Sequence, residues 1–380
     1  MRITALETGE ALQAFEGIWR QAYRESRTDN VFLSWEWSWL WWKHYGAEHR
    51  LRILVAEDAR GVAGIAPLLM SPGGPATRWR PVLHCIGDEK LADYTDFLII
   101  REASAVVKAI LGTLFTRRDW GLFELRRTPE TSPAFQPLCA ALHRQNTGGT
   151  CEIECASPYL DVSGGWHEYL ATRSKSLRQE LRTSANRLRA LGDTRFEVCQ
   201  GEALAEARKA LYAFHIQRQG HRPGRSIFED ARGRAFIDEL TELTSDGLAA
   251  DVSVIRVGDR PVSTVLTLRG RRTLYYWVPS FDSQIRSASL GKLHLRHLIE
   301  CAFAEKHAMV DLMIGEDGYK LDWSNGVQQN WRVVFYGDSA TGWVNRTVSG
   351  SKAMLRKVKA RSRVLRKLWT YLSKIQSQPE

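Results

Sequence analysis

The feature that most constrains the fold is an internal repeat, in which one order of elements occurs twice. Residues 51–70 and 251–268 each hold two β-rich runs around a short turn, the pattern of a β-hairpin. In the first half, a helix predicted over residues 11–24 precedes the hairpin, and a strand (96–100), a helix (103–116) and a strand (122–126) follow it. In the second half, the preceding helix covers residues 203–219, and a strand (273–278), a helix (291–306) and a strand (310–314) follow. This order predicts an α+β fold with mixed α/β sheets, built from two units of one type; chance recurrence of a common order is the alternative.

Turn-forming residues mark the boundary between the halves. Residues 128–137 and 147–158 are rich in them, and 380 residues suffice for two hydrophobic cores. We therefore predict an N-terminal unit over residues 1–150, a C-terminal unit over 151–345 and a separate tail over 346–380.

The net charge of +10 is concentrated at one end of the chain. Residues 351–380 hold nine lysines and arginines and one acid, so the rest of the chain is nearly neutral and we expect no DNA partner. Residues 351–376 have the leucine stripe of a basic amphipathic helix. Two interpretations remain open for this tail, peripheral contact with an anionic membrane face and docking on protein.

Several classes of protein do not fit the sequence. The first fifteen residues carry acids and no apolar core, no apolar run approaches the roughly 18 residues that span a bilayer, and six cysteines are too few for a disulfide scaffold. We expect a cytoplasmic protein, with the inner membrane face as the site of any peripheral contact. The cysteines and histidines complete no metal-binding pattern, so no metal is predicted.

The segment around Gly291 has the features of an anion site. A predicted strand ends at Val278, and a loop then leads to a helix that Ser287 or Ser289 can cap. A helix N-terminus after a strand offers unpaired N–H groups to a pyrophosphate, and Lys292 adds a full charge. Most such junctions bind nothing, which is the alternative interpretation.

The next predicted strand runs into an unusually polar loop, Gly315-Glu316-Asp317-Gly318-Tyr319-Lys320. Because α/β sheets place ligands at strand ends, Glu316 or Asp317 is a candidate general base and Tyr319 a candidate acid. The alternative is a turn with solvated acids. His215 is a further candidate base, although its apolar neighbours also suit a core histidine.

Several segments fit the pattern of one family, namely Phe32-Leu33-Ser34-Trp35, Trp41-Trp42, His215 with Arg218 and Gly220, Tyr275-Tyr276-Trp277, Phe281-Asp282, Ser289-Leu290-Gly291 and residues 311–323. In these segments the chain resembles the CelD/BcsL-type acetyltransferases of the Gcn5-related N-acetyltransferase (GNAT) superfamily, which are associated with cellulose and exopolysaccharide biosynthesis. The resemblance spans about residues 10–335 and is strongest over 250–325. Leu290 stands where the family usually has proline.

The resemblance implies tandem GNAT units, with acetyl-CoA or another acyl-CoA as co-substrate of the second unit. The pantetheine would lie along Tyr276, Trp277 and Val278, with the pyrophosphate at Ser289, Gly291 and Lys292. The acceptor, a small molecule or a glycan, would attack the thioester directly. Lys320, Arg218 and Trp35 are the candidate acceptor-binding residues, although the tryptophans of residues 35–42, which the family places on a helix, also suit domain packing.

Two other functions remain open. The related FemAB-type transferases use two such units and take an aminoacyl group from tRNA, and they also carry a lysine at the position of Lys320. The arginine-rich helix predicted over residues 166–191 suits RNA phosphates as well as solvent. A catalytically degenerate assembly factor for polysaccharide export is the non-enzymatic alternative.

Overall fold

The computed structural model describes residues 1–74, 77, 79–88, 90–144, 149–220, 226–285 and 288–337. The predicted tail helix and the tail over 346–380 lie outside these residues, as does Ser287. None of the helices within the described ranges is long and apolar enough to cross a membrane.

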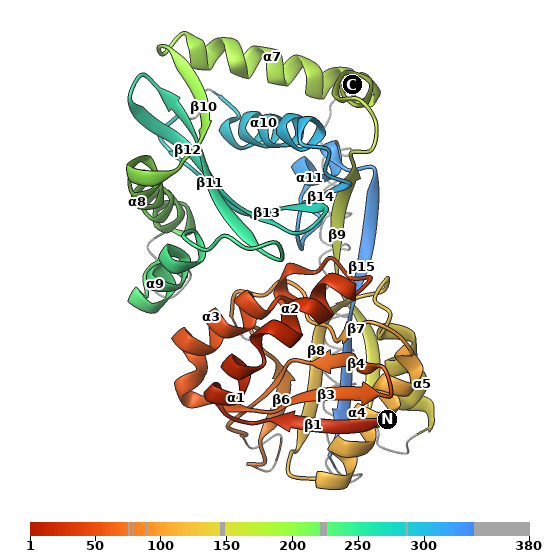
Figure 1. Cartoon of the computed structure of the whole chain (residues 1–380). Coiled ribbons are helices and arrows are strands. Elements are labelled where there is room, and N and C mark those ends of the chain that lie inside the picture. The colour runs from red at the N-terminus through yellow and green to blue at the C-terminus, as the bar shows by residue number, and fades with distance from the viewer. Residues whose placement is uncertain are drawn as a thin grey trace, which may run out of the picture.

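The predicted mixed α/β architecture is confirmed, because two sheets are flanked by helices (Figure 1). The smaller sheet has the order β1 (Arg2–Leu6), β3 (Ile53–Asp58), β4 (Gly61–Ala66) and β7 (Leu98–Ile99). The larger has the order β10 (Thr194–Val198), β11 (Ala249–Val257), β12 (Arg260–Arg269), β13 (Thr273–Phe281), β14 (Met309–Asp311), β9 (Thr150–Asp161), β15 (Gly326–Tyr336), β8 (Leu122–Pro129), β6 (Val82–Cys85), β5 (Leu68–Ser71) and β2 (Arg50–Leu51).

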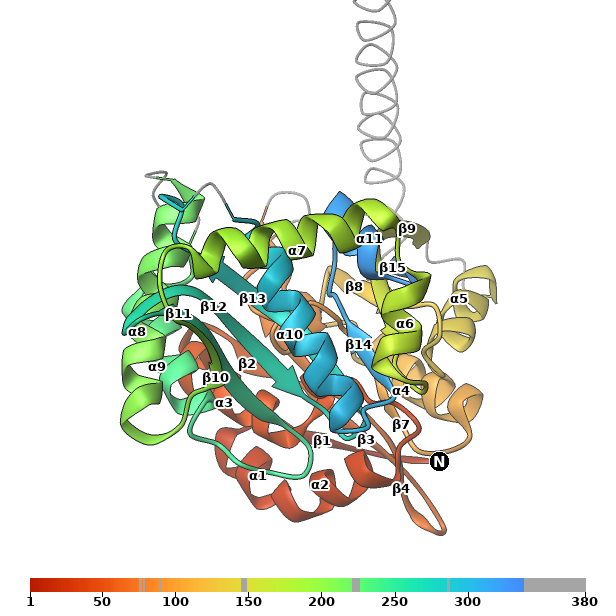
Figure 2. The same cartoon turned by 90° about the horizontal axis from the view of Figure 1, so that it is seen from above.

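Helices cover both sheets. In the first unit they are α1 (Gly9–Ala14), α2 (Glu16–Glu25), η1 (Val31–Leu33), α3 (Trp35–Tyr45), η2 (Gly46–Glu48), α4 (Ala103–Arg117) and α5 (Phe135–Arg144). In the second they are α6 (Trp166–Thr172), α7 (Lys175–Arg189), α8 (Gly201–Gln219), α9 (Ala231–Leu240), α10 (Leu290–Ala304) and α11 (Gly318–Trp323). Figure 2 shows α7 crossing over α10, which lies along β13.

Each unit contains one parallel strand pair joined through a helix. In the second unit the pair is β13–β14 with α10, and in the first it is β6–β8 with α4. The strand predicted over residues 96–100 was expected to be the first strand of this strand–helix–strand unit, which was wrong. It forms only the short strand β7, which pairs with β4 in the smaller sheet. The strand β6 takes its place, and its four residues are too short to give a periodic signal.

The two long strands β9 and β15 join the units (Figure 1). They pair with each other from Gly326 and Tyr159 to Val334 and Thr150. The strand β9, which follows the first unit in sequence, also pairs with β14, while β15, which follows the second unit, also pairs with β8. Each unit thus completes its sheet with a strand that follows the other unit along the chain.

Two predicted helices are each divided in two. The helix predicted over residues 11–24 breaks at Phe15, between α1 and α2. The helix predicted over residues 166–191 breaks between α6 and α7, where the Ser174 hydroxyl accepts a hydrogen bond from the Leu177 amide and so caps a new helix. The guanidinium of Arg173 donates to the carbonyls of Trp323 and Ser324, which holds the break open.

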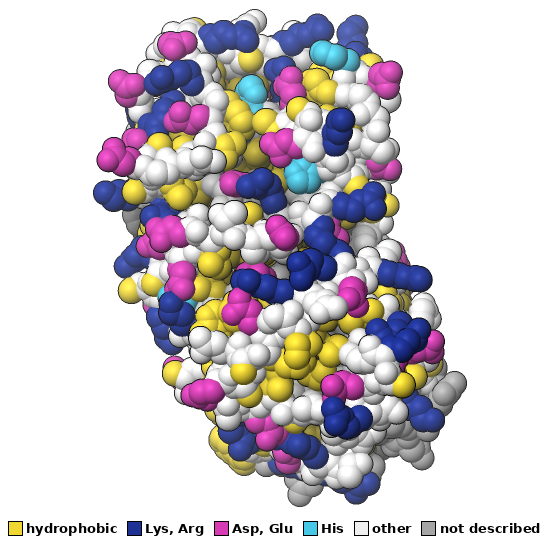
Figure 3. All heavy atoms as spheres, in the orientation of Figure 1, with side chains coloured by type: hydrophobic (Ala, Val, Ile, Leu, Met, Phe, Trp, Pro, Cys, Tyr) yellow, Lys and Arg dark blue, Asp and Glu magenta, His cyan; other side chains and the backbone are white. Residues whose placement is uncertain are grey.

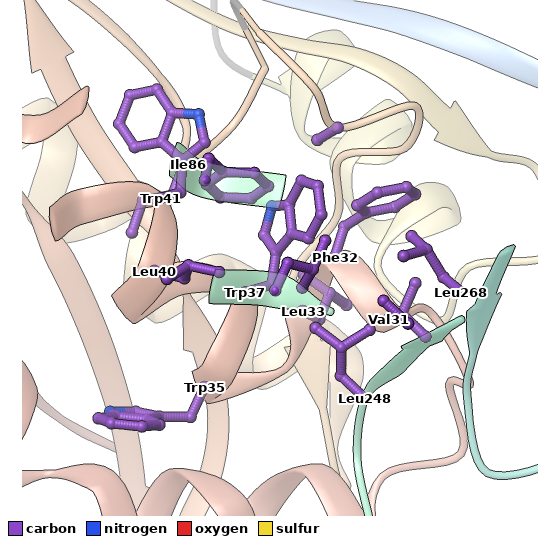
Figure 4. Packing of buried hydrophobic residues seen from close by; sticks show 14 of the residues in the cluster. Val31, Phe32, Leu33, Trp35, Trp37, Leu40, Trp41, Ile86, Leu248 and Leu268 are labelled. Carbon is purple, nitrogen blue, oxygen red and sulfur yellow. The ribbon is translucent and has the colours of Figure 1, made fainter. Parts of the chain in front are cut away.

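The tryptophan-rich segment forms a helix, as predicted. Ser34 caps α3 through its hydroxyl, and Gly46 ends it. Trp37 is fully buried between the units, with ring centroids 4.7 Å from Phe32, 5.3 Å from Phe236 and 5.6 Å from Trp277. Figure 4 shows Trp37 and Phe32 within this shared core. Because Phe236 and Trp277 come from the second unit, α3 binds the two units together.

Replacing Trp37 by alanine should lower the free energy of unfolding by about 3–5 kcal/mol, because it leaves a cavity that the neighbouring rings cannot fill. Urea denaturation followed by circular dichroism measures this change. The matched control is Trp79→Ala, since Trp79 is 74% exposed and its removal should change stability little. Equal effects of the two substitutions would contradict the assignment of Trp37 to the shared core.

Candidate functional site

The two strands of the parallel pair β13–β14 separate after a short stretch. Their pairing covers Thr273–Tyr275 and Met309–Asp311, while β13 continues to Phe281 and the other chain leaves toward α11. A β-bulge in β13 accompanies this separation, because Tyr276 and Val278 pair with successive residues of β12 and leave Trp277 as the extra residue. The arrangement opens the sheet at the ends of two adjacent strands, where α/β folds bind ligands.

The bulge decides which predicted residues face the opening. The side chain of Tyr276 packs on the α10 side of the sheet, whereas Trp277 and Val278 both pack in the core shared with the first unit. Of the three residues predicted along the pantetheine, only Tyr276 lines the cavity beside α10.

That cavity, which we call the α10 pocket, has a volume of about 480 Å³. It brings together six residues that were predicted from separate parts of the sequence, namely Arg218, Tyr276, Ser289, Gly291, Lys292 and Tyr319. Phe281, Ile285 and Leu290 supply apolar walls. A mostly apolar pocket with a few convergent polar groups is the usual form of a small-molecule site.

The N-terminus of α10 forms one wall of the pocket, but its polar side chains turn toward α7. Ser289 stands at the N-cap position without a side-chain capping bond. Its hydroxyl donates instead to Glu180 Oε1 at 2.7 Å, and Lys292 Nζ donates to Glu180 Oε2 at 2.8 Å. Lys292 also pairs with Asp322, at 3.1 Å. The hydrogen bond from Lys292, with that from Ser289, holds the pKa of the Glu180 carboxyl below its ordinary value.

Lys292, which was predicted to add a full charge for a pyrophosphate, lines the pocket but is already paired with two carboxylates. Glu180 lies on α7, a helix that is distant in sequence, and it already balances the lysine. Gly291 and Lys292 line the pocket, and their backbone amides, in the first turn of α10, receive no cap from the Ser289 side chain. A Cβ atom at Gly291 would meet only the Phe281 ring, at 3.5 Å, so the space at this position is not restricted to glycine.

The polar loop after β14 divides between the pocket and the core. Tyr319 is half-buried and lines the pocket, and burial together with the charge of Asp317 raises the pKa of its hydroxyl to about 12. Glu316 and Asp317 are exposed and do not line the pocket. Lys320 is buried; its Nζ donates to the Ile314 carbonyl at 2.7 Å, and burial lowers the pKa of its ammonium. Lys320 therefore shapes the loop from inside.

Two other predicted residues lie away from the pocket lining. His215 is half-buried beside Phe228 and shares a hydrogen bond of 2.8 Å with the Ser226 hydroxyl; burial, followed by the charge of Arg218, lowers the pKa of its imidazole to about 4. Trp35 is buried and stacks on Trp39 within the first unit. The tryptophan thus has the packing role that was the alternative.

Two acidic residues that interact with predicted site residues gave no signal in the sequence. One is Glu180, described above. The other is Asp93 of the first unit, which accepts a hydrogen bond from the Ile314 amide and interacts with the charge of Lys320. Burial raises the pKa of the Asp93 carboxyl to about 6. Neither residue belongs to a motif, since each reaches the loop only through the packing of distant segments.

The corresponding position in the first unit is closed. Beyond the parallel pair β6–β8, Arg127 Nη2 lies 2.8 Å from Asp88 Oδ1 and also donates to the Asp88 carbonyl. Both side chains are largely buried. The first unit therefore has a buried ion pair just beyond its parallel strands, whereas the second unit has the α10 pocket there.

Comparison with known proteins agrees with this location. Residues 175–321 match the family model described as an acetyltransferase (GNAT) domain. The second unit contains a GNAT domain. The match begins at α7 and ends within α11, so it includes the α10 pocket and the polar loop.

Solved structures support the fold over nearly the whole chain. FemX is 11% identical with a TM-score of 0.62, over 88% of this chain and 97% of FemX. A conserved protein of unknown function from Bacteroides thetaiotaomicron is 13% identical with a TM-score of 0.59, over 87% of this chain and all of the other. L-PGS from Bacillus licheniformis is 12% identical with a TM-score of 0.53, over 87% of this chain and 92% of L-PGS. No curated protein matches the sequence.

The position of α10 depends on a fully buried histidine, which makes stability depend on pH. His294 lies within 2.8 Å of the Ser253 and Ser263 hydroxyls, and burial lowers the pKa of its imidazole to about 3, below the ordinary 6.5. As the pH falls, His294 takes up a proton in the unfolded chain at a higher pH than in the folded protein. The free energy of unfolding should therefore fall between pH 6.5 and pH 3, by up to about 1.4 kcal/mol per pH unit.

Thermal or urea denaturation between about pH 5 and pH 7 measures how steeply the free energy of unfolding changes with pH. The variant His294→Gln should show a smaller slope whatever its absolute stability, while His167→Gln, at an exposed position, should keep that of the wild type. A slope unchanged by His294→Gln would contradict the assignment.

Proposed function

We propose that this chain is an acyltransferase that moves an acetyl or other acyl group from acyl-CoA to an amine or hydroxyl of a sugar or an envelope polysaccharide precursor. The observation that carries the proposal is the α10 pocket, which lies where β13 and β14 separate and is lined by the first turn of α10. The GNAT match supports acyl transfer. The resemblance to CelD/BcsL-type proteins suggests the class of acceptor.

The residues of the pocket fit a CoA thioester. Uncapped amides at Gly291 and Lys292 suit the pyrophosphate, and the exposed guanidinium of Arg218 lies on the same pocket. Phe281 and Ile285 offer apolar contact to the pantetheine arm. When bound, the thioester would supply an activated carbonyl for direct attack.

Tyr319 is the side chain best placed to assist the reaction. It lines the pocket beside Tyr276, and its raised pKa keeps the hydroxyl protonated at neutral pH, as a general acid requires. Glu316 and Asp317, exposed beside Tyr319, would carry a released proton to solvent. We assign them this role because they are outside the pocket lining.

A second candidate is FemAB-type transfer from aminoacyl-tRNA, and one observation favours it. Glu180 is already bonded to Ser289 and Lys292 at the N-terminus of α10, and a carboxylate there opposes a second anion. The arginines Arg182, Arg187 and Arg189 of α7 are exposed. Figure 3 shows basic side chains along the top of the molecule, where Figure 1 places α7. They suit the phosphates of RNA.

The charge of Glu180 provides a test of the donor. Replacing Glu180 by glutamine keeps the hydrogen-bonding shape but removes the negative charge, so acetyl-CoA should bind several-fold, about 5-fold, more tightly in calorimetry. Gly291→Asp, which adds a carboxylate at the same place, should abolish binding, and Gly291→Ala, which adds only a methyl group, is its control.

If wild type and Glu180→Gln both fail to bind acetyl-CoA, the proposal is wrong. Salt-dependent binding of aminoacyl-tRNA by the same preparations would then establish the second candidate. Binding of neither donor by a folded protein would leave the assembly factor as the remaining function.

The role of Tyr319 is tested by Tyr319→Phe, which removes only the hydroxyl. We expect kcat for acetyl transfer to fall by about 10²-fold or more, with the KM for acetyl-CoA nearly unchanged, because a general acid acts in the transition state. Steady-state kinetics with acetyl-CoA and glucosamine measure both constants. Tyr159→Phe, outside the pocket lining, is the control, and full turnover by Tyr319→Phe would refute the assignment.

A further inference from the structure

A second cavity lies on the opposite face of β13 from the α10 pocket. Tyr276 lines the α10 pocket, whereas its neighbour Tyr275 lines this second cavity, because successive side chains of a strand point to opposite faces. The cavity has a volume of about 560 Å³ and lies between the two units. Its walls come from the loop before η1, the loop before β7, the loop after β8 and the strands β13, β14 and β15; we call it the inter-unit cavity.

Two buried carboxylates line this cavity. Asp96 is fully buried; its Oδ1 accepts hydrogen bonds from the Ser132 hydroxyl at 2.6 Å and from the Phe97 amide at 2.7 Å, while Oδ2 has no partner. Asp311 is 5% exposed and accepts from the Tyr94 hydroxyl at 2.9 Å and from the Met313 amide at 2.7 Å.

Over the described part of the chain, no lysine or arginine forms an ion pair with Asp96 or Asp311. Lys320 favours the ionised form of Asp311 from a distance, but its hydrogen bonds go to main-chain carbonyls. Burial consequently raises the pKa of Asp96 to about 7 and that of Asp311 to about 6. A buried carboxylate without a counter-charge is costly, and such groups gather at functional sites.

The cavity also offers hydrogen bonding for the rest of a polar ligand. Asn30 is only 6% exposed, and its amide oxygen caps η1 by accepting a hydrogen bond from the Phe32 amide. Its side-chain amide nitrogen has no partner. Arg27 lines the same cavity and is exposed. The walls therefore combine one unpartnered carboxylate oxygen, on Asp96, with the unpartnered Asn30 amide nitrogen, the unpartnered Thr28 hydroxyl and an exposed cation.

We propose that the inter-unit cavity binds the acceptor, and that the acceptor is a primary amine whose ammonium group is held by Asp96 and Asp311. An ammonium brings both the hydrogen-bond donors and the positive charge that these carboxylates lack, whereas a neutral hydroxyl brings only a donor. The role as acceptor site rests on the proposed acyl transfer, but the binding of the amine does not. The pairing of β13 with β14 ends at Tyr275 and Asp311, which both line the cavity, so the bound amine would lie at the edge of the opening that leads to the donor on the other face.

The test measures binding of amines to the full chain without any acyl donor, by ligand-observed NMR and calorimetry at millimolar concentration. The probes are glucosamine and ethanolamine, with glucose and ethylene glycol as matched neutral controls. We expect each amine to bind at least about tenfold more tightly than its control, as hydrogen bonds to charged groups predict.

Two variants locate the binding. Asp96→Asn should weaken the binding of both amines by at least about tenfold, because it removes the negative charge and keeps the shape of the side chain. Thr131→Lys, at an exposed lining position, offers the cavity an ammonium of its own and should compete with both amines without disturbing the core. Asp259→Asn, at a fully exposed carboxylate, is the control and should leave binding unchanged.

Each outcome decides the proposal. Equal binding of amines and neutral controls, no binding of either amine, or amine binding that survives both Asp96→Asn and Thr131→Lys overturns it. If the amines do not bind while acetyl-CoA still binds, the proposed acyltransferase function is retained and only the assignment of this acceptor site is wrong. If the amines bind while acetyl-CoA does not, the cavity is an amine site and the donor assignment falls.

Discussion

The pairing of β9 with β15 is the interaction on which the rest of the structure depends. Each strand follows one unit along the chain and completes the sheet of the other, so the sheet continues from β10 to β2 without an edge between the units. Separating the units would expose the edges of both long strands and break their ladder. The fixed relative position of the units is what allows residues of the first unit to line cavities of the second.

The site illustrates this dependence. The opening between β13 and β14 is local to the second unit, yet its surroundings come from elsewhere: Glu180 from α7, Asp93 from the loop before β7, and Trp37 from α3. The first unit keeps the same parallel pair but closes it with the ion pair of Arg127 and Asp88. One unit thus holds the pocket, and the other supplies walls and charges.

Several elements could be predicted because their signals are local. The α3 helix has its cap at Ser34 and its end at Gly46, and the strand, helix and strand around α10 follow from apolar periodicity. The grouping of Tyr276, Gly291 and Tyr319 was also expected from the resemblance. The break at Arg173 was missed because the carbonyls that hold it, those of Trp323 and Ser324, lie about 150 residues away in the chain. The bulge at Trp277 was missed because it is defined by pairing with β12.

The sequence by itself determined the repeat, the order of the elements and the chemical types gathered near residues 276–320, because these depend on periodicity, caps and turns within one segment. Only the tertiary structure decided which of those groups are free to act. It paired Lys292 with Glu180, turned Lys320 into the core and enclosed Asp96 and Asp311 without an ion pair to any residue that the structure describes. Charge balance and burial depend on which distant segments come into contact, and no local pattern records those contacts.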